Sequence, residues 1–327
     1  MRLLLATDGS PSAERALQLL LQEPWPAPSA ARVVTVLDEV AMSAGNPWPI
    51  VAPVAPFDVD EVARAAAGDT LERAAARLRP ALTVDTAILD GRPAQAITDE
   101  ARRWGADVIV VGSRGHGTLS SMVLGSVSAE VIDLSDRPVL IARGDRVRDV
   151  ILAVDGSAGA ERAVDLVLHW LPLRATRVHV VSVAPSPYPW WVGMAEAGGV
   201  TTVPQLLESE EATRLDEEEL VQATVERLTR AGYTASGSVR EGDAADQLIK
   251  AVEATGSELI VVGTRGRTGL TRLVLGSVAR KVVMHAPCSV LVVHPPRVGA
   301  SGGRFAESGA SEDRTGEPLA MTGAPQR

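Results

Sequence analysis

The chain has a single cysteine, Cys288, among 327 residues, and its only lysines are Lys250 and Lys281. One cysteine cannot form an intrachain disulfide, which fits a reducing cytoplasm. No apolar run reaches the ~18 residues of a membrane-spanning helix. The first apolar run ends at Asp8, too early for a signal peptide. The formal net charge of −9 disfavours nucleic acid and anionic membranes as main partners. We therefore expect a cytoplasmic globular protein.

A length of 327 residues favours two domains of ~150 residues, each large enough for its own core. We expect domains at residues 1–145 and 146–296. Residues 297–327 are rich in Gly, Ser, Glu and Ala and show no periodicity. Such a segment cannot bury enough apolar surface to offset its ordering entropy, so we expect a disordered tail.

One glycine pattern occurs twice, as Gly-x-x-Gly, nine residues and then Gly-Ser. A bare Gly-x-x-Gly is a weak signal, but two copies with the same nine-residue gap are hard to ascribe to chance. Neither copy has the Gly-Lys-Ser/Thr ending of a Walker A loop. The two copies comprise Gly112, Gly115, Gly125 and Ser126, and Gly263, Gly266, Gly276 and Ser277.

The segments around this pattern are duplicated as well. Each half opens with a short apolar run and Asp-Gly-Ser, and a glycine stands 21 positions before the motif in both halves, at Gly91 and Gly242. Val-rich runs alternate with helical patterns throughout, which is typical of parallel sheets. The sequence therefore predicts an α/β protein of two tandem, doubly wound, Rossmann-like domains. Each would be a five-stranded parallel sheet with helices on both faces.

Each motif follows an apolar strand pattern and precedes a helical pattern, at residues 126–134 and 277–285. The first N–H groups of a helix lack intrahelical partners, and the helix dipole adds partial positive charge there. Glycine allows close approach of the backbone to a phosphate, and also positive φ. Ser126 and Ser277 could either cap the helix or contact a phosphate oxygen. The alternative is a set of turn glycines without a ligand.

Asp8 and Asp155 end the first strand of each half. In open α/β sheets the ligand lies beyond the carboxyl ends of the strands, where a carboxylate can accept hydrogen bonds from ribose. The alternative is that both aspartates only cap the following turn, because duplication would copy a cap too.

These residues resemble the universal stress protein family, in its ATP-binding branch, over about residues 1–296. The resemblance implies sheet order 3-2-1-4-5 and ATP, optionally with Mg²⁺, across the first and fourth strands. It also implies backbone contacts to adenine near the end of the second strand. Carried over by position, the implied nucleotide-binding residues are Asp8, Val36, Gly112, Gly115, Gly125 and Ser126 in the first half, and Asp155, Val183, Gly263, Gly266, Gly276 and Ser277 in the second.

Arg114 and Arg265 lie within the motifs and could pair with phosphate; a solvated loop arginine is the alternative. His116 has Arg267 as its counterpart, which disfavours a shared catalytic role. Two irregular loops hold half of the aromatic residues. These either pack against the body or form a lid or partner patch. The residues are Trp48, Phe57, Tyr188, Trp190 and Trp191.

We interpret the chain as a nucleotide-dependent sensor or regulator that binds adenine nucleotide at two sites. One alternative is a slow ATPase or nucleotidyl transferase on the same fold, and another is a dimerisation scaffold without nucleotide. Unpaired apolar strand edges invite pairing, so we expect strands 139–142 and 289–293 to meet in an intramolecular pseudo-dimer. A homodimer of whole chains is a further option.

Overall fold

The computed structural model describes residues 1–22, 25, 28–38, 59–115, 124–170, 176–185, 203–264 and 275–294. Residues Met1–Pro295 form one compact unit. The predicted tail, the two aromatic loops, His116, Arg265 and Gly266 lie outside the described residues.

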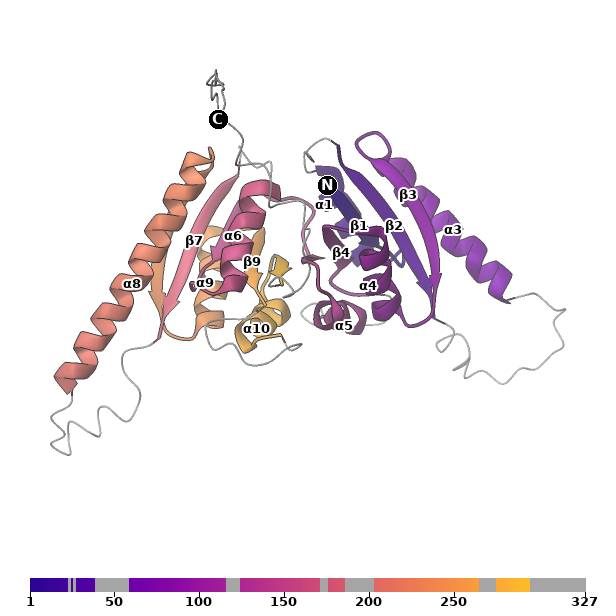
Figure 1. Cartoon of the computed structure of the whole chain (residues 1–327). Helices are drawn as coiled ribbons and strands as arrows, with labels where there is room; N and C mark the ends of the chain where they lie inside the picture. The colour runs from indigo at the N-terminus through magenta and orange to yellow at the C-terminus, as the bar shows by residue number, and fades with distance from the viewer. Residues whose placement is uncertain are drawn as a thin grey trace, which may run out of the picture. The chain divides into compact units, whose positions relative to one another are not determined.

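The first half alternates strands and helices, as predicted (Figure 1). Its elements are β1 (Arg2–Ala6), α1 (Pro11–Gln22), β2 (Ala30–Leu37), α3 (Val59–Leu78), β3 (Thr83–Asp90), α4 (Pro93–Trp104), β4 (Val108–Gly112), α5 (Ser126–Leu134) and β5 (Val139–Ala142).

The second half repeats this order. Its elements are β6 (Asp149–Ala153), α6 (Ala158–Trp170), β7 (Arg177–Ala184), α8 (Val203–Arg230), β8 (Thr234–Glu241), α9 (Ala244–Thr255), β9 (Leu259–Gly263), α10 (Ser277–His285) and β10 (Ser289–Val293).

The strands are ordered β3-β2-β1-β4-β5-β10-β9-β6-β7-β8. Each half is a parallel sheet of order 3-2-1-4-5, which confirms the predicted doubly wound fold. The chain order reverses between β1 and β4, and between β6 and β9. These reversals are the points where such sheets bind ligands.

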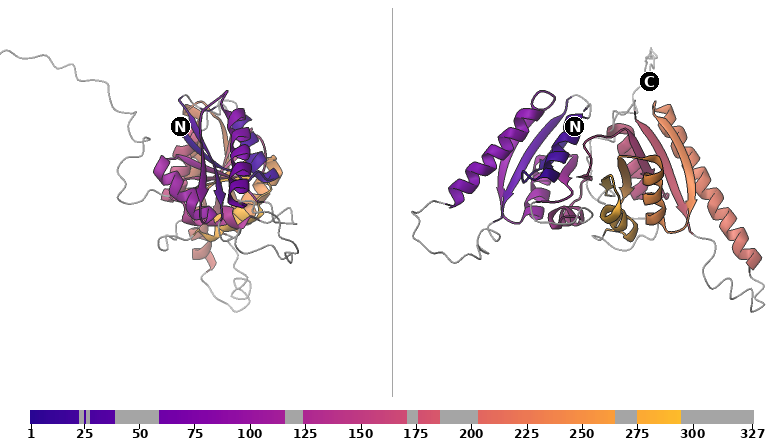
Figure 2. Two further views of the ribbon diagram at one scale, coloured as in Figure 1. Left: turned by 90° about the vertical axis from the view of Figure 1, so that its right-hand side faces the viewer. Right: turned by 180° about the vertical axis from the view of Figure 1, so that it is seen from behind.

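Both faces of the sheet are covered, because side chains alternate between two hydrophobic clusters. Leu3 and Leu5 belong to a cluster with α1, α3, α6 and α8, whereas Leu4 belongs to a cluster with α4, α5, α9 and α10. Strands buried on both faces read as near-continuous apolar runs rather than alternating ones, as β4 does. In two further views α3 can be followed along β2 and β3 within its half (Figure 2).

The two halves are joined through β5 and β10, which pair antiparallel with Leu140 opposite Leu291. A displacement of 151 positions relates Leu140 to Leu291, and also Gly112 to Gly263. The central pair thus consists of equivalent residues, consistent with a local two-fold relation. The predicted meeting of the two fifth strands is confirmed.

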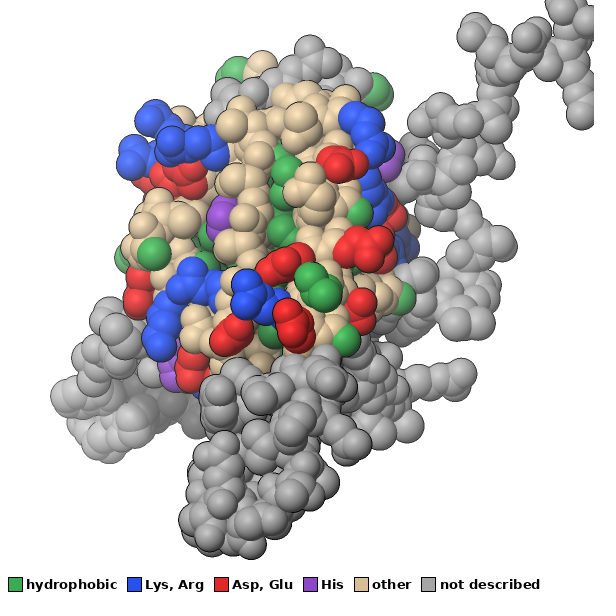
Figure 3. Space-filling model, turned by 90° about the vertical axis from the view of Figure 1, so that its left-hand side faces the viewer, with side chains coloured by type: hydrophobic (Ala, Val, Ile, Leu, Met, Phe, Trp, Pro, Cys, Tyr) green, Lys and Arg blue, Asp and Glu red, His purple; other side chains and the backbone are tan. Residues whose placement is uncertain are grey.

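The outer edges of the ten-stranded sheet are β3 and β8. The side of the molecule that carries α8 shows Lys/Arg and Asp/Glu side chains close together, with scattered hydrophobic ones (Figure 3). Polar edge strands and mixed surface charge discourage pairing with other chains. No helix in the described part of the chain combines the length and apolarity needed to cross a membrane.

Candidate nucleotide site

Parallel pairing brings the predicted aspartates and glycine motifs to one edge of the sheet. β1 pairs with β4, with Ala6 opposite Val111, so Asp8 and Gly112 follow at the same edge. In the second half Leu152 lies opposite Val261, and Asp155 and Gly263 follow.

The second strand of each half extends further toward this edge. In the first half the N–H of Thr7 donates to the carbonyl of Val34 at 2.9 Å. Val36 therefore lies two residues beyond the last pair of β1 and β2. Val183 holds the corresponding place in β7.

The first motif glycine allows a helix to seat directly on the strand end. A Cβ at Gly112 would lie 2.6 Å from the carbonyl carbon of Ser12, and one at Gly263 would lie 2.8 Å from that of Gly159. The glycines with positive φ among the described residues are others, such as Gly9 and Gly156. The expectation of positive φ is therefore wrong for the described motif glycines, which are required for close packing.

The remaining glycines hold the ends of each loop together. A Cβ at Gly115 would lie 2.7 Å from Asp8 Oδ2, so the carboxylate reaches the loop. The N–H of Gly125 donates to the carbonyl of Ser113 at 2.8 Å, and that of Gly276 to Thr264 at the same distance. These bonds place the starts of α5 and α10 beside the ends of β4 and β9.

Gly125 and Gly276 take the N-cap positions of α5 and α10. Ser126 and Ser277 are the first helical residues, so the capping alternative for these serines is wrong. An N-cap residue has extended backbone, and both glycines do, with ψ of 149° and 156°. The first turn of α10 and Asp155 line the same pocket, and the N–H groups of such a turn have no intrahelical partner.

Both aspartates do shape the turn that follows them. Oδ1 of Asp8 accepts a hydrogen bond from the N–H of Ser10 at 2.9 Å, and Oδ1 of Asp155 accepts one from Ser157 at 3.0 Å. The hydroxyl of Ser10 accepts a hydrogen bond from the N–H of Ala13 at 3.2 Å, as an N-cap residue does. These turn bonds confirm a local structural role for both aspartates, and a carboxylate can accept more than one hydrogen bond.

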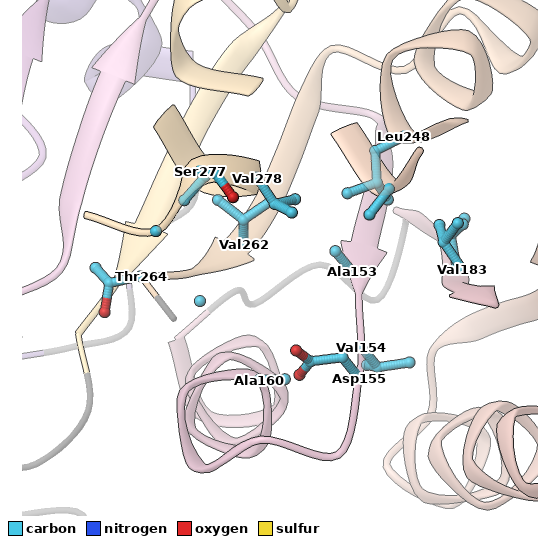
Figure 4. A pocket seen from close by; sticks show the side chains of 15 residues that line it. Ala153, Val154, Asp155, Ala160, Val183, Leu248, Val262, Thr264, Ser277 and Val278 are labelled. Atoms are coloured by element: carbon cyan, nitrogen blue, oxygen red, sulfur yellow. The ribbon is translucent and has the colours of Figure 1, made fainter. Parts of the chain in front are cut away.

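A pocket of about 170 Å³ lies at this edge in the second half. A 150 Å³ apolar cavity can hold benzene, so this space suits one aromatic group. Val183 and Leu248 lie at one end and Thr264 at the other, with Asp155 and Ser277 between them (Figure 4). The lining residues are Ala153, Val154, Asp155, Ala160, Val181, Val183, Ala244, Leu248, Val262, Gly263, Thr264, Gly276, Ser277, Val278 and Ala279.

This pocket unites five of the seven residues predicted for the second half, namely Asp155, Val183, Gly263, Gly276 and Ser277. The other two, Arg265 and Gly266, lie outside the described residues. In the first half Arg114 is half-buried, and its N–H donates to the hydroxyl of Ser12 at 3.0 Å.

Several hydroxyls at the site are absent from the sequence prediction. Ser128 donates to the carbonyl of Gly112 at 2.7 Å and so fixes α5 to the end of β4. Ser12 lies 3.2 Å from Ser113, Oγ to Oγ. The only signal for Ser12 was a difference between the two Asp-Gly-Ser segments, because Gly159 takes its place in the second half.

Among the described residues, no group of three or more His, Cys, Asp or Glu side chains converges. The polar groups at this edge are instead hydroxyls, backbone N–H donors and one acceptor carboxylate per half. This combination suits the ribose and phosphates of a nucleotide, with apolar residues alongside for a base.

Fold and site together define a class: tandem α/β proteins with a glycine-loop site where the strand order reverses. A model of the universal stress protein family matches residues 1–143 and 146–294. The chain belongs to the universal stress protein family.

Similar proteins span bacteria and archaea. The chain is 30% identical over 220 residues to a universal stress protein of Mycolicibacterium smegmatis, covering 65% of this chain and 70% of that one. It is 28% identical over 163 residues to one of Methanocaldococcus jannaschii, covering 48% and 89%. A solved universal stress protein from Archaeoglobus fulgidus has a TM-score of 0.60 at 20% identity, covering 90% and 98%. At this identity the likeness concerns the fold alone.

Proposed function

We infer that the chain binds adenine nucleotide, ATP in the first instance, at the two strand-order reversals. The observation that carries this inference is the pocket in the second half, which joins an apolar end, a carboxylate and a helix start. Proteins place ligands at such reversals for reasons of topology. The domains would be residues 1–145 and 146–296.

Each part of the site has a matching ligand group. Val183 and Leu248 would enclose the adenine, and the carboxylate of Asp155 would accept hydrogen bonds from ribose hydroxyls. The N–H groups at the start of α10, with the Ser277 hydroxyl, would hold phosphates, and Mg²⁺ could share them. By correspondence, Asp8, Val36, Gly112, Gly115, Gly125 and Ser126 would do this in the first half, with Arg114 and Arg265 as further phosphate partners.

The direct test is to denature the purified chain and identify the released nucleotide by absorbance and mass spectrometry. Titration calorimetry with ATP and Mg²⁺ should then give two nucleotides per chain. Gly125→Val and Gly276→Val each remove one site, because a Cβ at Gly125 would already lie 3.1 Å from Arg114 Cα. Titration with AMP and cyclic AMP would identify the preferred ligand. Failure of ATP and both of these to bind would favour the scaffold alternative.

The site is built for holding a nucleotide rather than for fast turnover. Rapid phosphoryl transfer needs a positioned nucleophile and a cation on the developing charge. Neither glycine loop contains Lys, Asp or Glu, so Arg114 and Arg265 could supply the cation but no loop carboxylate can position an attacking water. We expect phosphate release far below the range of about 1 to 1,000 per second usual for enzymes. A rate above about one per second that disappears in the Gly125→Val/Gly276→Val variant would support the enzyme alternative.

Slow turnover suits a regulator whose state depends on the nucleotide it holds. A bound nucleotide stabilises the form that binds it by mass action, so occupancy can report nucleotide concentration.

A further inference from the structure

The two sites differ at one buried corner, between the helix that follows the first strand and the strand that precedes the glycine loop. In the first half this corner is filled by Ser12 of α1, whose Oγ lies 3.2 Å from Ser113 Oγ. Ser12 also accepts a hydrogen bond from the N–H of Arg114 at 3.0 Å. Both serines are buried, and both hydroxyls have partners.

In the second half the same two positions hold Gly159 and Thr264. Gly159 is the second residue of α6, as Ser12 is of α1, and Thr264 follows Gly263 as Ser113 follows Gly112. The Thr264 side chain is only 3% exposed, and its Oγ1 has no hydrogen-bond partner among the described residues. Because Gly159 has no side chain, it offers Thr264 Oγ1 no hydroxyl like the one that Ser12 offers Ser113 in the first half.

A buried hydroxyl without a partner loses its hydration without gaining a protein hydrogen bond and so destabilises a fold, which calls for an explanation. Thr264 lines the pocket at the end opposite Val183 and Leu248, beside Gly263 and Gly276 (Figure 4). An oxygen atom supplied from the pocket would satisfy the hydroxyl.

We propose that Gly159 and Thr264 form a subsite for an oxygen of the bound nucleotide, which the first half lacks because Ser12 fills it. The two halves are then unequal: the second binds nucleotide more tightly, and Thr264 sets the difference. This proposal rests on the nucleotide function inferred above.

The experiment measures each site alone by titration calorimetry on the full chain. Asp8→Ala weakens the first site and leaves the second to be measured, whereas Asp155→Ala does the reverse. In the Asp8→Ala chain, Thr264→Val should weaken ATP binding about tenfold, the usual effect of losing one hydrogen bond to a charged group. In the Asp155→Ala chain, the matched Ser113→Ala should change it less than about twofold, since Ser113 already has a protein partner.

A reciprocal exchange tests the subsite directly. Gly159→Ser should weaken the second site by filling the corner, and Ser12→Gly should strengthen the first. Repeating Thr264→Val with adenosine identifies the atom: an effect with ATP alone indicates a phosphate oxygen, and an effect with both ligands indicates a ribose hydroxyl.

A thermal melt of the ligand-free protein separates ligand binding from a structural role. Because the Thr264 hydroxyl has no hydrogen-bond partner in the part of the chain that the structure describes, Thr264→Val should leave the melting temperature unchanged or raise it, while weakening ATP binding. Nucleotide bound equally at both sites and unaffected by Thr264→Val or Gly159→Ser would overturn the subsite but not the nucleotide function. Absence of nucleotide binding in the unmodified chain would instead overturn the nucleotide function.

Discussion

His294 shows how one side chain ties the stability of this protein to pH. Its Nε2 donates to the carbonyl of Ile132 in α5 at 3.0 Å. Burial of the ring lowers its pKa to about 4; the hydrogen bond to the Ile132 backbone and the nearby Asp136 carboxylate only partly oppose this shift, and Arg162 adds to it. The imidazole is therefore neutral at physiological pH.

We predict that the free energy of unfolding falls as pH decreases from about 6.5 to about 4. The unfolded chain, with its ordinary histidine pKa near 6.5, binds a proton in this window that the folded chain does not. The loss attributable to His294 is at most ~3 kcal/mol and stops below pH 4, where both states are protonated.

Urea unfolding at several pH values would measure this effect. His294→Gln keeps a donor but cannot titrate, so its stability should fall less steeply between pH 6.5 and 4. Parallel pH profiles for the unmodified chain and His294→Gln would contradict the prediction.

The sequence was informative about residues whose role depends on local context. The Asp-Gly-Ser segments identified Asp8 and Asp155 as candidate site residues. The shared nine-residue gap identified the two glycine motifs. Thr264 could not be recognised in this way, because its partner depends on how closely α6 seats against β9. That contact brings Gly159 against Gly263, which lie about 100 positions apart in the sequence, so no local sequence pattern predicts it.

At the scale of elements, the strands and helices were predictable because each is bounded by a clear signal. Gly105 ends α4 in the left-handed conformation, with a φ of 70°. Proline begins both α1 and α4. Capping was one of two roles left open for Ser126, but Gly125 takes the N-cap position of α5, and its N–H donates to the carbonyl of Ser113.

The long helix α8 lies unusually close to the edge strand β8. A Cβ at Gly237 would lie 2.4 Å from Val221 Cγ1 and 3.0 Å from Val225 Cγ2. We predict that Gly237→Ala destabilises the protein by about 1–3 kcal/mol, because valine is stiff and cannot move aside easily.

A double-mutant cycle by urea unfolding would isolate this contact. Val221→Ala should cost stability alone, since Val221 is buried, but should relieve the clash in the Gly237→Ala background. The combined cost should thus be smaller than the sum of the two single costs. Simple additivity would show that α8 and β8 adjust without strain.

At the scale of the whole molecule, the two halves share more than one strand pair. Arg143, just after β5, donates to the carbonyls of Val283 and Cys288 in the other half. His294, just after β10, reaches Ile132, which corresponds to Val283 after the displacement of 151 positions. The same contact is therefore made twice, in opposite directions, with different side chains.

The alternation of strands and helices predicted a parallel, doubly wound sheet in each half, and the strand order 3-2-1-4-5 was implied by the family resemblance. The junction was predicted from the need to cover two apolar edges, and it is observed. Its polar contacts were not predicted, because Arg143 and His294 follow their strands without any distinguishing motif.

The shared sheet leads to a prediction about cooperativity. Leu140 and Leu291 pair at the centre of the junction, are almost fully buried, and belong to one hydrophobic cluster with residues from both halves. Such continuity couples the two halves, so residues 1–295 should unfold in a single transition by differential scanning calorimetry. The calorimetric enthalpy should equal the van't Hoff enthalpy of the whole unit.

Leu140→Ala and Leu291→Ala provide a matched pair of tests for this coupling. Each removes an equivalent buried leucine and should cost about 2–5 kcal/mol, lowering the one melting temperature by a similar amount. Because the leucines lie in different halves, uncoupled halves would instead give two transitions, with each substitution shifting only its own. Two separable peaks in the unmodified chain would contradict the prediction, since each five-stranded sheet would then be a folding unit that tolerates loss of its neighbour.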